Sequence, residues 1–417
     1  MCPVVIPPVS MDDLKSGVSR RNLLLGGAAA AGVAGASAWA ISESRRSAEQ
    51  VAFGAETVPF FGAHQAGVET PPQSNAVFVG LDLVSGGRRQ AREILEAVLK
   101  LWTADAQRLT QGAAALADTE PELALRPARL TVTVGLGPTV FDRIGLSRLR
   151  PPSAHPLPDF PTDRLESRWS ATDLILQICA DDPVVVAHAT RVLVKNVRTL
   201  ADERWRQIGF RTARGAEADG VTQRNLMGQV DGTVNPVAGT PDFDQVVWSD
   251  GDPRPWMAGG TLMVLRRIRM NLDAWDALDR TSKELVVGRR LDNGAPLTGQ
   301  HENDPVDTTV LRDGIPVIPP NAHAALAHPQ QPEQRFLRRP YNYDDPPSAG
   351  EVSNSGLLFV SYQRDIDAQF LPVQSRLAQS DAMNRWITAV GSAVYVIPPG
   401  VKPGGFLGGQ LFSAAAV

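Results

Sequence analysis

The sequence predicts an α+β protein made of two similar halves that join near residue 215. The first half shows the order strand, helix, strand, strand, helix, and strands and helices alternate again in the second half. The length of 417 residues fits two or three domains. Long connections rich in proline, glycine and aspartate, chiefly residues 214–258 and 286–350, separate these elements, and connections of that length tend to carry function.

In the first half, runs and spacings of apolar residues define each element. Residues 76–83 form an almost continuous apolar run, which predicts a strand buried on both faces. Residues 90–102 have apolar side chains at helical spacing. Residues 130–135 alternate as a strand does, and residues 173–179 predict another strand. Residues 183–200 predict a helix with proline in its first turn.

The second half is expected to repeat that order. Residues 260–266 and 356–362 predict strands, because both are short, apolar and bounded by glycine or polar residues. Helices are predicted over residues 271–285 and 380–390.

Residues 1–40 have the features of an export leader. Arg20 and Arg21 precede a segment, residues 23–41, that is rich in alanine and glycine, and this arrangement resembles the twin-arginine signal. Residues 41–57 are polar and without periodicity, so we expect a flexible lead-in to the folded protein.

The resemblance to a twin-arginine signal implies export of a folded protein through the Tat translocon, to the cell-wall or periplasmic side. Small residues around Ala38 and Ala40 fit a cleavage site. An uncleaved N-terminal anchor is the alternative, but the alanine and glycine content of the segment makes it a weak membrane span. We therefore expect no stable membrane anchor.

Charge and cysteine content exclude several classes of protein. The net charge of −4 provides no basic surface for nucleic acid. Cys2 lies in the leader and Cys179 lies in an apolar run, so the mature chain can form no internal disulfide, and Cys179 is expected to be a small buried residue. The sequence has no Cys-x-x-Cys-His motif, which excludes covalent c-type haem attachment.

Three polar segments could carry chemistry, although each has an ordinary structural explanation. Residues 228–236 contain the turn signals Asp-Gly and Asn-Pro. Residues 321–329 contain His323 and His328, which are five apart, whereas a helical metal pair needs a spacing of about three or four. Residues 335–343 could be a basic, solvated loop.

Together these segments resemble the dye-decolourising peroxidases, specifically the exported branch of that family. Residues 228–236 match the family's GxxDG signature. The resemblance extends from about residue 58 to about residue 410. It also includes residues 58–67, 288–299, 356–365 and 391–395.

The resemblance implies a fold and a cofactor. The fold would consist of two ferredoxin-like units with antiparallel sheets, residues 58–215 and 216–417, in the family's dimeric α/β-barrel-like arrangement. One haem b per chain would bind without covalent attachment, mainly to the C-terminal unit.

The resemblance also implies roles for particular residues. His323 would be the proximal iron ligand, Asp231 the distal acid and base, and Arg338 the distal arginine, with the adjacent Arg339 as an open alternative. A carboxylate can move a proton between the two oxygens of a peroxide, and a guanidinium can stabilise the negative charge that develops without losing its own proton.

Three further residues are expected near the haem. Asp381 would lie behind His323, where a carboxylate makes an axial imidazole more basic. The alternative for Asp381 is an ordinary helix N-cap. Gly232 and Phe359 are the other expected haem contacts.

The implied activity is reduction of hydrogen peroxide with oxidation of an unknown electron donor, such as a dye, a phenol or an inorganic ion. An exported haem-binding or deferrochelatase-type protein of iron uptake is the main alternative. A cofactor-free ligand-binding protein is a third possibility. Four aromatic residues could relay electrons to the surface, although core packing explains each of them as well: Trp275, Tyr362, Trp386 and Tyr395.

Overall fold

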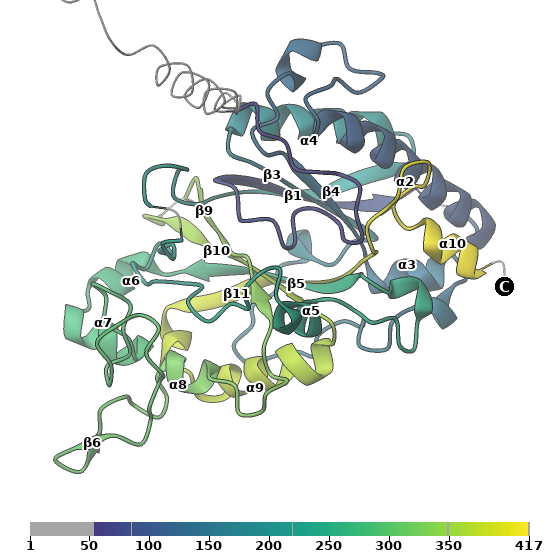
Figure 1. Cartoon of the computed structure of the whole chain (residues 1–417). Helices are drawn as coiled ribbons and strands as arrows, with labels where there is room; N and C mark the ends of the chain where they lie inside the picture. Colours follow the sequence, from purple (N-terminus) through teal and green to yellow (C-terminus); the bar gives the residue numbers. More distant parts are fainter. Residues whose placement is uncertain (1–53, 85, 219, 348–349, 416–417) are drawn as a thin grey trace, which may run out of the picture. The chain divides into compact units, whose positions relative to one another are not determined.

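Antiparallel strands from both halves of the chain close into one barrel in the computed structural model, which describes residues 54–84, 86–218, 220–347 and 350–415 (Figure 1). Within that part of the chain, the strand order is β5-β11-β2-β3-β1-β4-β9-β10-β8. The sheet closes because β5 pairs with β10 as well as with β11. β8 adds no further edge, since it continues β9 along β10 in the same register.

The first half contributes four neighbouring strands of the barrel. These are β1 (Asn75–Leu83), β2 (Thr131–Leu136), β3 (Leu174–Ala180) and β4 (Ala201–Phe210), in the order β2-β3-β1-β4. The helices of this half are α2 (Arg88–Leu109), α3 (Pro138–Arg143) and α4 (Pro183–Val197). The chain therefore runs β1-α2-β2-β3-α4-β4, which is the ferredoxin-like arrangement.

The second half repeats this arrangement. Its strands are β5 (Thr261–Met270), β8 (Leu337–Arg338), β9 (Tyr341–Asp345), β10 (Asn354–Gln363) and β11 (Ile387–Ile397), in the order β9-β10-β5-β11. Its helices are α5 (Pro241–Val247), α6 (Leu272–Asp276), α7 (Arg280–Val287), α8 (His323–Ala327), α9 (Leu371–Ser380) and α10 (Gly409–Ala415). The fold class that the sequence predicted is confirmed.

Short elements complete the described chain. A hairpin of β6 (Leu311–Arg312) and β7 (Ile315–Pro316) stands apart from the barrel. A π-helical turn, Ile366–Phe370, leads into α9. The single 3-10 turns are Pro121–Ala124, Ser147–Leu149, Ser167–Trp169, Pro255–Met257 and Ala382–Arg385. Among the described residues, no helix combines the length and apolar character that crossing a bilayer requires.

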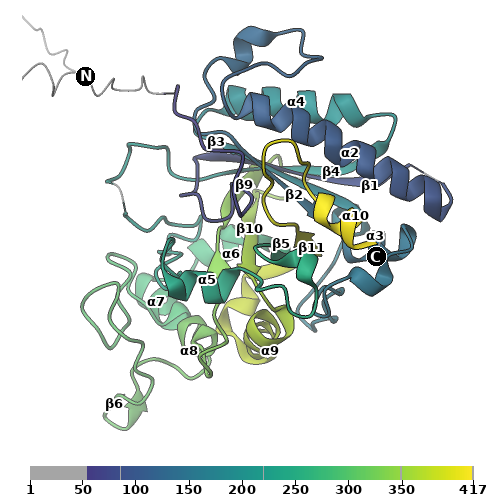
Figure 2. The same ribbon diagram turned by 45° about the vertical axis from the view of Figure 1, so that its right-hand side comes forward.

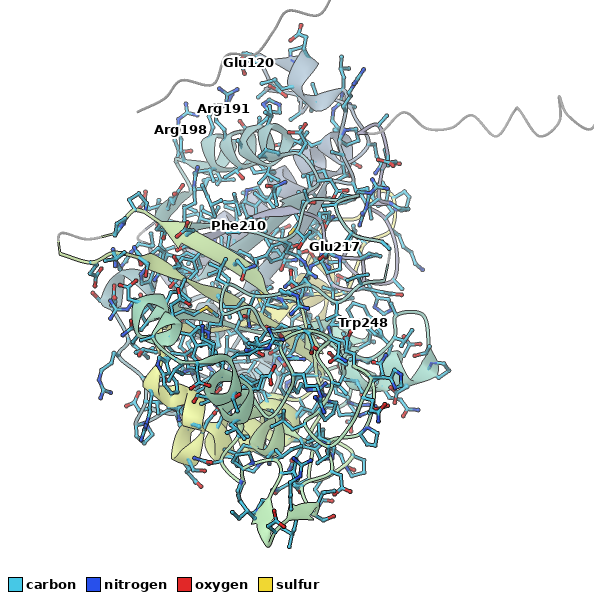
Figure 3. All side chains as sticks on the ribbon, turned by 90° about the vertical axis from the view of Figure 1, so that its left-hand side faces the viewer. Glu120, Arg191, Arg198, Phe210, Glu217 and Trp248 are labelled. Atoms are coloured by element: carbon cyan, nitrogen blue, oxygen red, sulfur yellow. The ribbon has the colours of Figure 1, made fainter. Side chains whose placement is uncertain are left out.

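The two halves meet at two narrow seams of the barrel. β4 joins β9 at the pair Phe210 and Asn342, and Figure 3 labels Phe210. β11 joins β2 at the pair Val396 and Leu136. Because so few backbone bonds cross these seams, packing inside the barrel must contribute to holding the halves together.

Alternating side chains divide the apolar residues between the inside and the outside of the barrel. The interior contains side chains from both halves, and Phe78 of β1 packs edge-on against Tyr341 of β9 at 6.0 Å between ring centroids. Outside, α2 and α4 cover the strands of the first half, and Figure 2 shows α8 and α9 on the opposite side. The Trp102 indole N–H donates to the Leu193 carbonyl at 3.0 Å and links α2 to α4.

Two of the predicted helices are wrong. Residues 380–390 are not a helix, because α9 ends at Ser380, a 3-10 turn follows, and the β-branched residues from Ile387 onward belong to β11. Residues 271–285 are two helices rather than one, and the second begins after Asp279, whose carboxylate caps it by accepting a bond from the Ser282 N–H at 3.0 Å.

Several strands were missing from the prediction, notably the last strand of each half. β4 carries charged side chains outward and buries only alternate residues, so it has no apolar run. The predicted leader, residues 1–40, lies outside the described residues, as does most of the predicted lead-in. The described end of that lead-in contacts the first half, since the carbonyls of Gly54 and Glu56 accept bonds from the Ala128 and Arg129 N–H groups at 2.8 Å. The domain boundaries stay predictions.

We expect Phe78→Ala to lower the free energy of unfolding by about 3–5 kcal/mol, because the ring is fully buried between the two halves. Urea denaturation of the purified protein measures the change. Val184→Ala, at a side chain that is 56% exposed on α4, is the matched control and should change stability by less than about 0.5 kcal/mol. Equal effects of the two variants would contradict the packing described for the interior.

Candidate active site

His323 and Asp381 form a hydrogen-bonded pair between two helix ends. His323 is the first residue of the short helix α8, and Asp381 follows the last residue of α9. The His323 Nδ1 lies 2.6 Å from the Asp381 Oδ2. The other carboxylate oxygen of Asp381 accepts a bond from the Met383 N–H at 2.9 Å. Asp381 therefore caps a helical turn and also contacts His323, and its role behind a haem ligand stays a prediction.

The Asp381 carboxylate orients the imidazole of His323 and favours its protonated form. Burial lowers the pKa of His323, but the charge and hydrogen bond of Asp381 outweigh burial and raise this pKa above its ordinary value. Asp381 is only 1% exposed, whereas the His323 side chain is 31% exposed. Among the described residues, the His323 Nε2 has no hydrogen-bond partner, so this atom is free to bind a metal ion.

A tight loop presents Asp231. Arg224 and Val230 form an isolated antiparallel bridge, and the Asp231 N–H donates to the Gln223 carbonyl at 2.9 Å. The turns on either side need glycine, since Gly228 and Gly232 have φ angles of +81° and +131°. The two glycines of the GxxDG signature therefore act by shaping the backbone around the aspartate.

Asp231 and Arg338 form an ion pair across 107 residues of sequence, with 3.0 Å between the Arg338 Nη1 and the Asp231 Oδ1. Their side chains are 12% and 25% exposed, respectively. The charges of both residues also act on the pKa of His323, which Arg338 lowers and Asp231 raises. The ion pair and the histidine pair therefore share one electrostatic environment.

The two adjacent arginines point to opposite sides of the barrel wall. Arg338 points outward to Asp231, whereas Arg339 is 1% exposed and packs inside the barrel. Arg339 donates to the Thr70 carbonyl and to the Gln73 Oε1. Because successive side chains of a strand alternate, only one of the two arginines can reach Asp231.

Aromatic rings form an apolar surface on the outside of β10. Phe359 points outward and is half-buried, with its ring centroid 6.3 Å from that of Phe336 and 6.0 Å from that of Phe370. A haem group needs an axial ligand such as a histidine with a free nitrogen and apolar surface for its ring, and polar groups nearby tune its reactivity. The residues present therefore fit a haem group.

Sequence reasoning missed two arginines near the ion pair. The Arg289 side chain donates to the carbonyls of Gly294 and Glu302 at 2.8 and 3.0 Å. Burial and then the charge of Arg338 lower the pKa of Arg289. Burial lowers the pKa of Arg211 to about 10, and the nearby Asp231 opposes that shift. Arg289 lies in a segment that carried the family resemblance, but nothing in the sequence distinguished Arg211.

The aromatic residues considered as electron relays are packed in the interior of the protein or against it. Trp275, Tyr362 and Tyr395 are at most 1% exposed, and each polar group of theirs has a hydrogen-bond partner. Trp386 is half-buried and packs edge-on against Trp275 at 5.4 Å. Cys179 is free and buried in the barrel, as predicted, and burial raises the pKa of its thiol.

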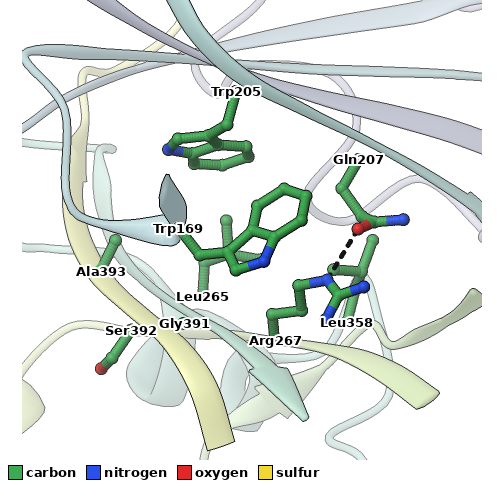
Figure 4. A pocket seen from close by; sticks show the side chains of 9 residues that line it. All are labelled: Trp169, Trp205, Gln207, Leu265, Arg267, Leu358, Gly391, Ser392 and Ala393. Carbon is green, nitrogen blue, oxygen red and sulfur yellow. Dashed lines mark hydrogen bonds between the residues drawn. The ribbon is translucent and has the colours of Figure 1, made fainter. Parts of the chain in front are cut away.

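A separate cavity lies inside the barrel and contains none of the predicted site residues. Arg267 extends along it between the rings of Trp169 and Tyr343, at 4.5 and 4.0 Å from their centroids. Its guanidinium also donates to the Gln207 Oε1 at 2.7 Å and pairs with Asp345 at 2.9 Å. These contacts compensate a buried charge. The lining residues are Trp169, Trp205, Gln207, Leu265, Arg267, Leu358, Gly391, Ser392 and Ala393 (Figure 4).

Two family models match the chain. Residues 65–211 match the Dyp-type peroxidase N-terminal domain, and residues 222–402 match the C-terminal domain. The chain belongs to the Dyp-type peroxidase family. It is therefore a haem-dependent peroxidase by family, as the sequence segments had implied.

Two related proteins and one crystal structure align with most of this Dyp-type peroxidase. It is 38% identical to a dye-decolorizing peroxidase of Thermobifida fusca over 424 aligned residues, which cover 96% of this chain and 98% of the relative. It is 34% identical to a deferrochelatase of Escherichia coli, covering 83% and 85% of the two chains. A crystal structure of a Dyp-type peroxidase from Cellulomonas bogoriensis is 51% identical and covers 86% of this chain and 98% of its own, with a TM-score of 0.82.

We expect Gly232→Ala to lower the free energy of unfolding by roughly 1–3 kcal/mol, because alanine is strained at a φ of +131°. Chemical denaturation followed by tryptophan fluorescence measures the effect. Gly62→Ala is the matched control: its φ is not in the left-handed region, and an added Cβ would meet only ordinary contacts. That variant should stay within about 0.5 kcal/mol of the parent. A neutral Gly232→Ala would argue against the backbone role of the signature glycine.

Proposed function

We propose that this protein reduces hydrogen peroxide with Asp231 as the distal acid and base, Arg338 as the distal arginine and His323 as the proximal iron ligand. The observation that carries the proposal is the 3.0 Å ion pair of Asp231 and Arg338 in the electrostatic environment of His323. The electron donor would be an organic compound such as a dye or phenol, or an inorganic ion.

Asp231 and Arg338 supply complementary chemistry. The Asp231 carboxylate accepts a proton from one peroxide oxygen and returns it to the other, which then leaves as water. The Arg338 guanidinium stabilises the negative charge on the departing oxygen. Because the two side chains contact each other, the guanidinium also holds the carboxylate in a fixed position.

The remaining predicted residues would hold the cofactor. When bound, haem supplies the iron that exchanges electrons with peroxide and donor. His323 would bind the iron through Nε2, while Asp381 keeps the Nδ1 proton directed away from the metal. Phe359 supplies apolar contact, and the absence of a side chain at Gly232 lets the turn after Asp231 approach the haem. The positive charges of Arg289 and Arg211 suit the carboxylates of haem.

Haem binding for delivery or iron removal is the second candidate function, since the Escherichia coli relative is named a deferrochelatase. Both functions require haem at His323. Only peroxide turnover requires a distal proton carrier and a fixed positive charge. The Asp231–Arg338 ion pair therefore favours the peroxidase.

We expect the absorption spectrum of the haem-loaded protein to change within the mixing time after one equivalent of hydrogen peroxide. Asp231→Ala should keep the haem band but slow this change by about 100- to 10,000-fold, because the proton carrier is gone. His323→Ala should weaken or abolish the haem band itself. Stopped-flow absorption measures the rates, and Asp242→Ala, at an exposed ion pair with Arg335, should react as the parent does.

Other spectra would favour the second function or contradict the site. A haem band that stays unchanged or only bleaches with peroxide would favour haem binding or delivery. Full peroxide reactivity in Asp231→Ala would remove Asp231 from the reaction. Stoichiometric haem with an unaltered spectrum in His323→Ala would mean that another residue binds the iron.

We also propose that the protein is exported after folding by the Tat translocon and acts outside the cytoplasm. The support is the arginine pair ahead of the alanine- and glycine-rich segment at residues 23–41. Insertion of a cofactor in the cytoplasm is a reason to export a folded protein, and a haem protein meets that condition.

A double substitution, Arg20→Lys with Arg21→Lys, should leave the protein in the cytoplasm, whereas the parent is exported and processed. Immunoblots of cell fractions measure the distribution. The chain provides its own control, because a second arginine pair, Arg45 and Arg46, follows the apolar segment instead of preceding it. Lysines at these two positions should not affect export, and equal export of all three proteins would contradict the proposed signal.

A further inference from the structure

We propose that Asn235 is a positioning residue that fixes the distal arginine, an inference that rests on the proposed role of Arg338. The Asn235 side-chain amide contacts the backbone of Arg338 at both ends. Its Oδ1 accepts a bond from the Arg338 N–H at 2.9 Å, and its Nδ2 donates to the Arg338 carbonyl at 2.7 Å.

The two bonds provide partners for the N–H and carbonyl of Arg338, which lie on a strand edge without a neighbouring strand at this point. In an antiparallel sheet, the N–H and C=O of one residue point to the same edge, and those of the next residue point to the other edge. Arg339 directs its N–H to the Val360 carbonyl of β10 at 2.8 Å. Arg338 therefore directs its own groups away from β10. β4 reaches β9 only at Asn342, so the amide of Asn235 takes the place of a neighbouring strand at Arg338.

Asn235 also belongs to the turn that presents the distal carboxylate. Its own N–H donates to the Gly232 carbonyl at 3.1 Å, which closes the turn directly after Asp231. A second bond supports the same docking, since the Gln223 Nε2 donates to the Pro340 carbonyl at 3.3 Å. The loop that carries Asp231 is thereby attached to the strand that carries Arg338.

The position of the Arg338 guanidinium relative to the Asp231 carboxylate consequently depends on Asn235. The guanidinium and the carboxylate come from segments more than 100 residues apart, and their contact of 3.0 Å requires both backbones to be held in place. Small displacements of catalytic groups slow a reaction strongly, because charge stabilisation and proton transfer depend steeply on distance. Asn235 itself contacts the backbone of Arg338 rather than its guanidinium, so it acts through Arg338.

Asn235→Ala and Asn235→Asp test this role. Alanine removes both bonds, whereas aspartate keeps the size and the acceptor but lacks the donor for the Arg338 carbonyl. We expect both variants to retain haem and Tm, and to react with hydrogen peroxide about 10- to 100-fold more slowly than the parent. Val234→Ala is the matched control, because this neighbouring side chain is 74% exposed, and it should react as the parent does.

A double-mutant cycle separates positioning from other roles. In the Arg338→Ala background, a further Asn235→Ala should slow the reaction less than about twofold, because the group that it positions is absent. Fluoride affinity of the ferric protein gives a readout independent of turnover, since a guanidinium stabilises a bound anion. Fluoride should bind more weakly to Asn235→Ala, with no further loss when Arg338 is also replaced.

Different results would overturn the positioning role of Asn235 or the proposed function of Arg338. Normal peroxide and fluoride reactions in both Asn235 variants, with a slow Arg338→Ala, would overturn the positioning role alone. Equal slowing by Asn235→Ala in the two backgrounds would show that it acts independently of Arg338 and would also overturn it. Loss of haem or a large drop in Tm in both Asn235 variants would assign the residue to folding instead. An unimpaired Arg338→Ala would overturn the proposed function of Arg338 itself.

Discussion

The two-residue repeat of the barrel strands governs which side chains reach the site. Along the strand that runs from Leu337 to Asp345, Arg338 points outward to Asp231 and Arg339 points into the barrel. The register against β10 is constant over this stretch, and a slip by one residue would exchange the two arginines. Closure of the sheet prevents such a slip, because β10 is also paired with β5 on its other edge.

A barrel with a densely packed, partly charged interior gives the surrounding loops a rigid support. Arg267 and Arg339 are buried inside it, and their charges are balanced by aromatic rings, carbonyls, amides and one carboxylate. These contacts involve strands from both halves, so they add to the narrow backbone seams. His323, Asp231 and Arg338 lie outside this interior and remain partly exposed, whereas Asp381 is buried behind His323.

Each pair at the site joins segments that are far apart in the sequence. Asp381 reaches His323 because α9 ends where α8 begins, and the capping bond to Met383 holds the carboxylate in place. Asp231 meets Arg338 because a loop docks along a strand edge. In both pairs a backbone hydrogen bond fixes a residue of the proposed site, so the precision of the site depends on ordinary secondary-structure contacts.

The sequence by itself determined the family, the α+β class, most strands of the first half and the residues of the two pairs, because apolar periodicity and short signatures are local properties. It could not supply β4, which buries Gln207 and exposes Ile208 and Phe210, or the end of α9, where a 3-10 turn separates the helix from β11. Which of Arg338 and Arg339 reaches Asp231 was likewise open, since neighbouring residues of one type look alike in a sequence. Tertiary structure decided it, because pairing with β10 fixes which face of the strand each side chain occupies.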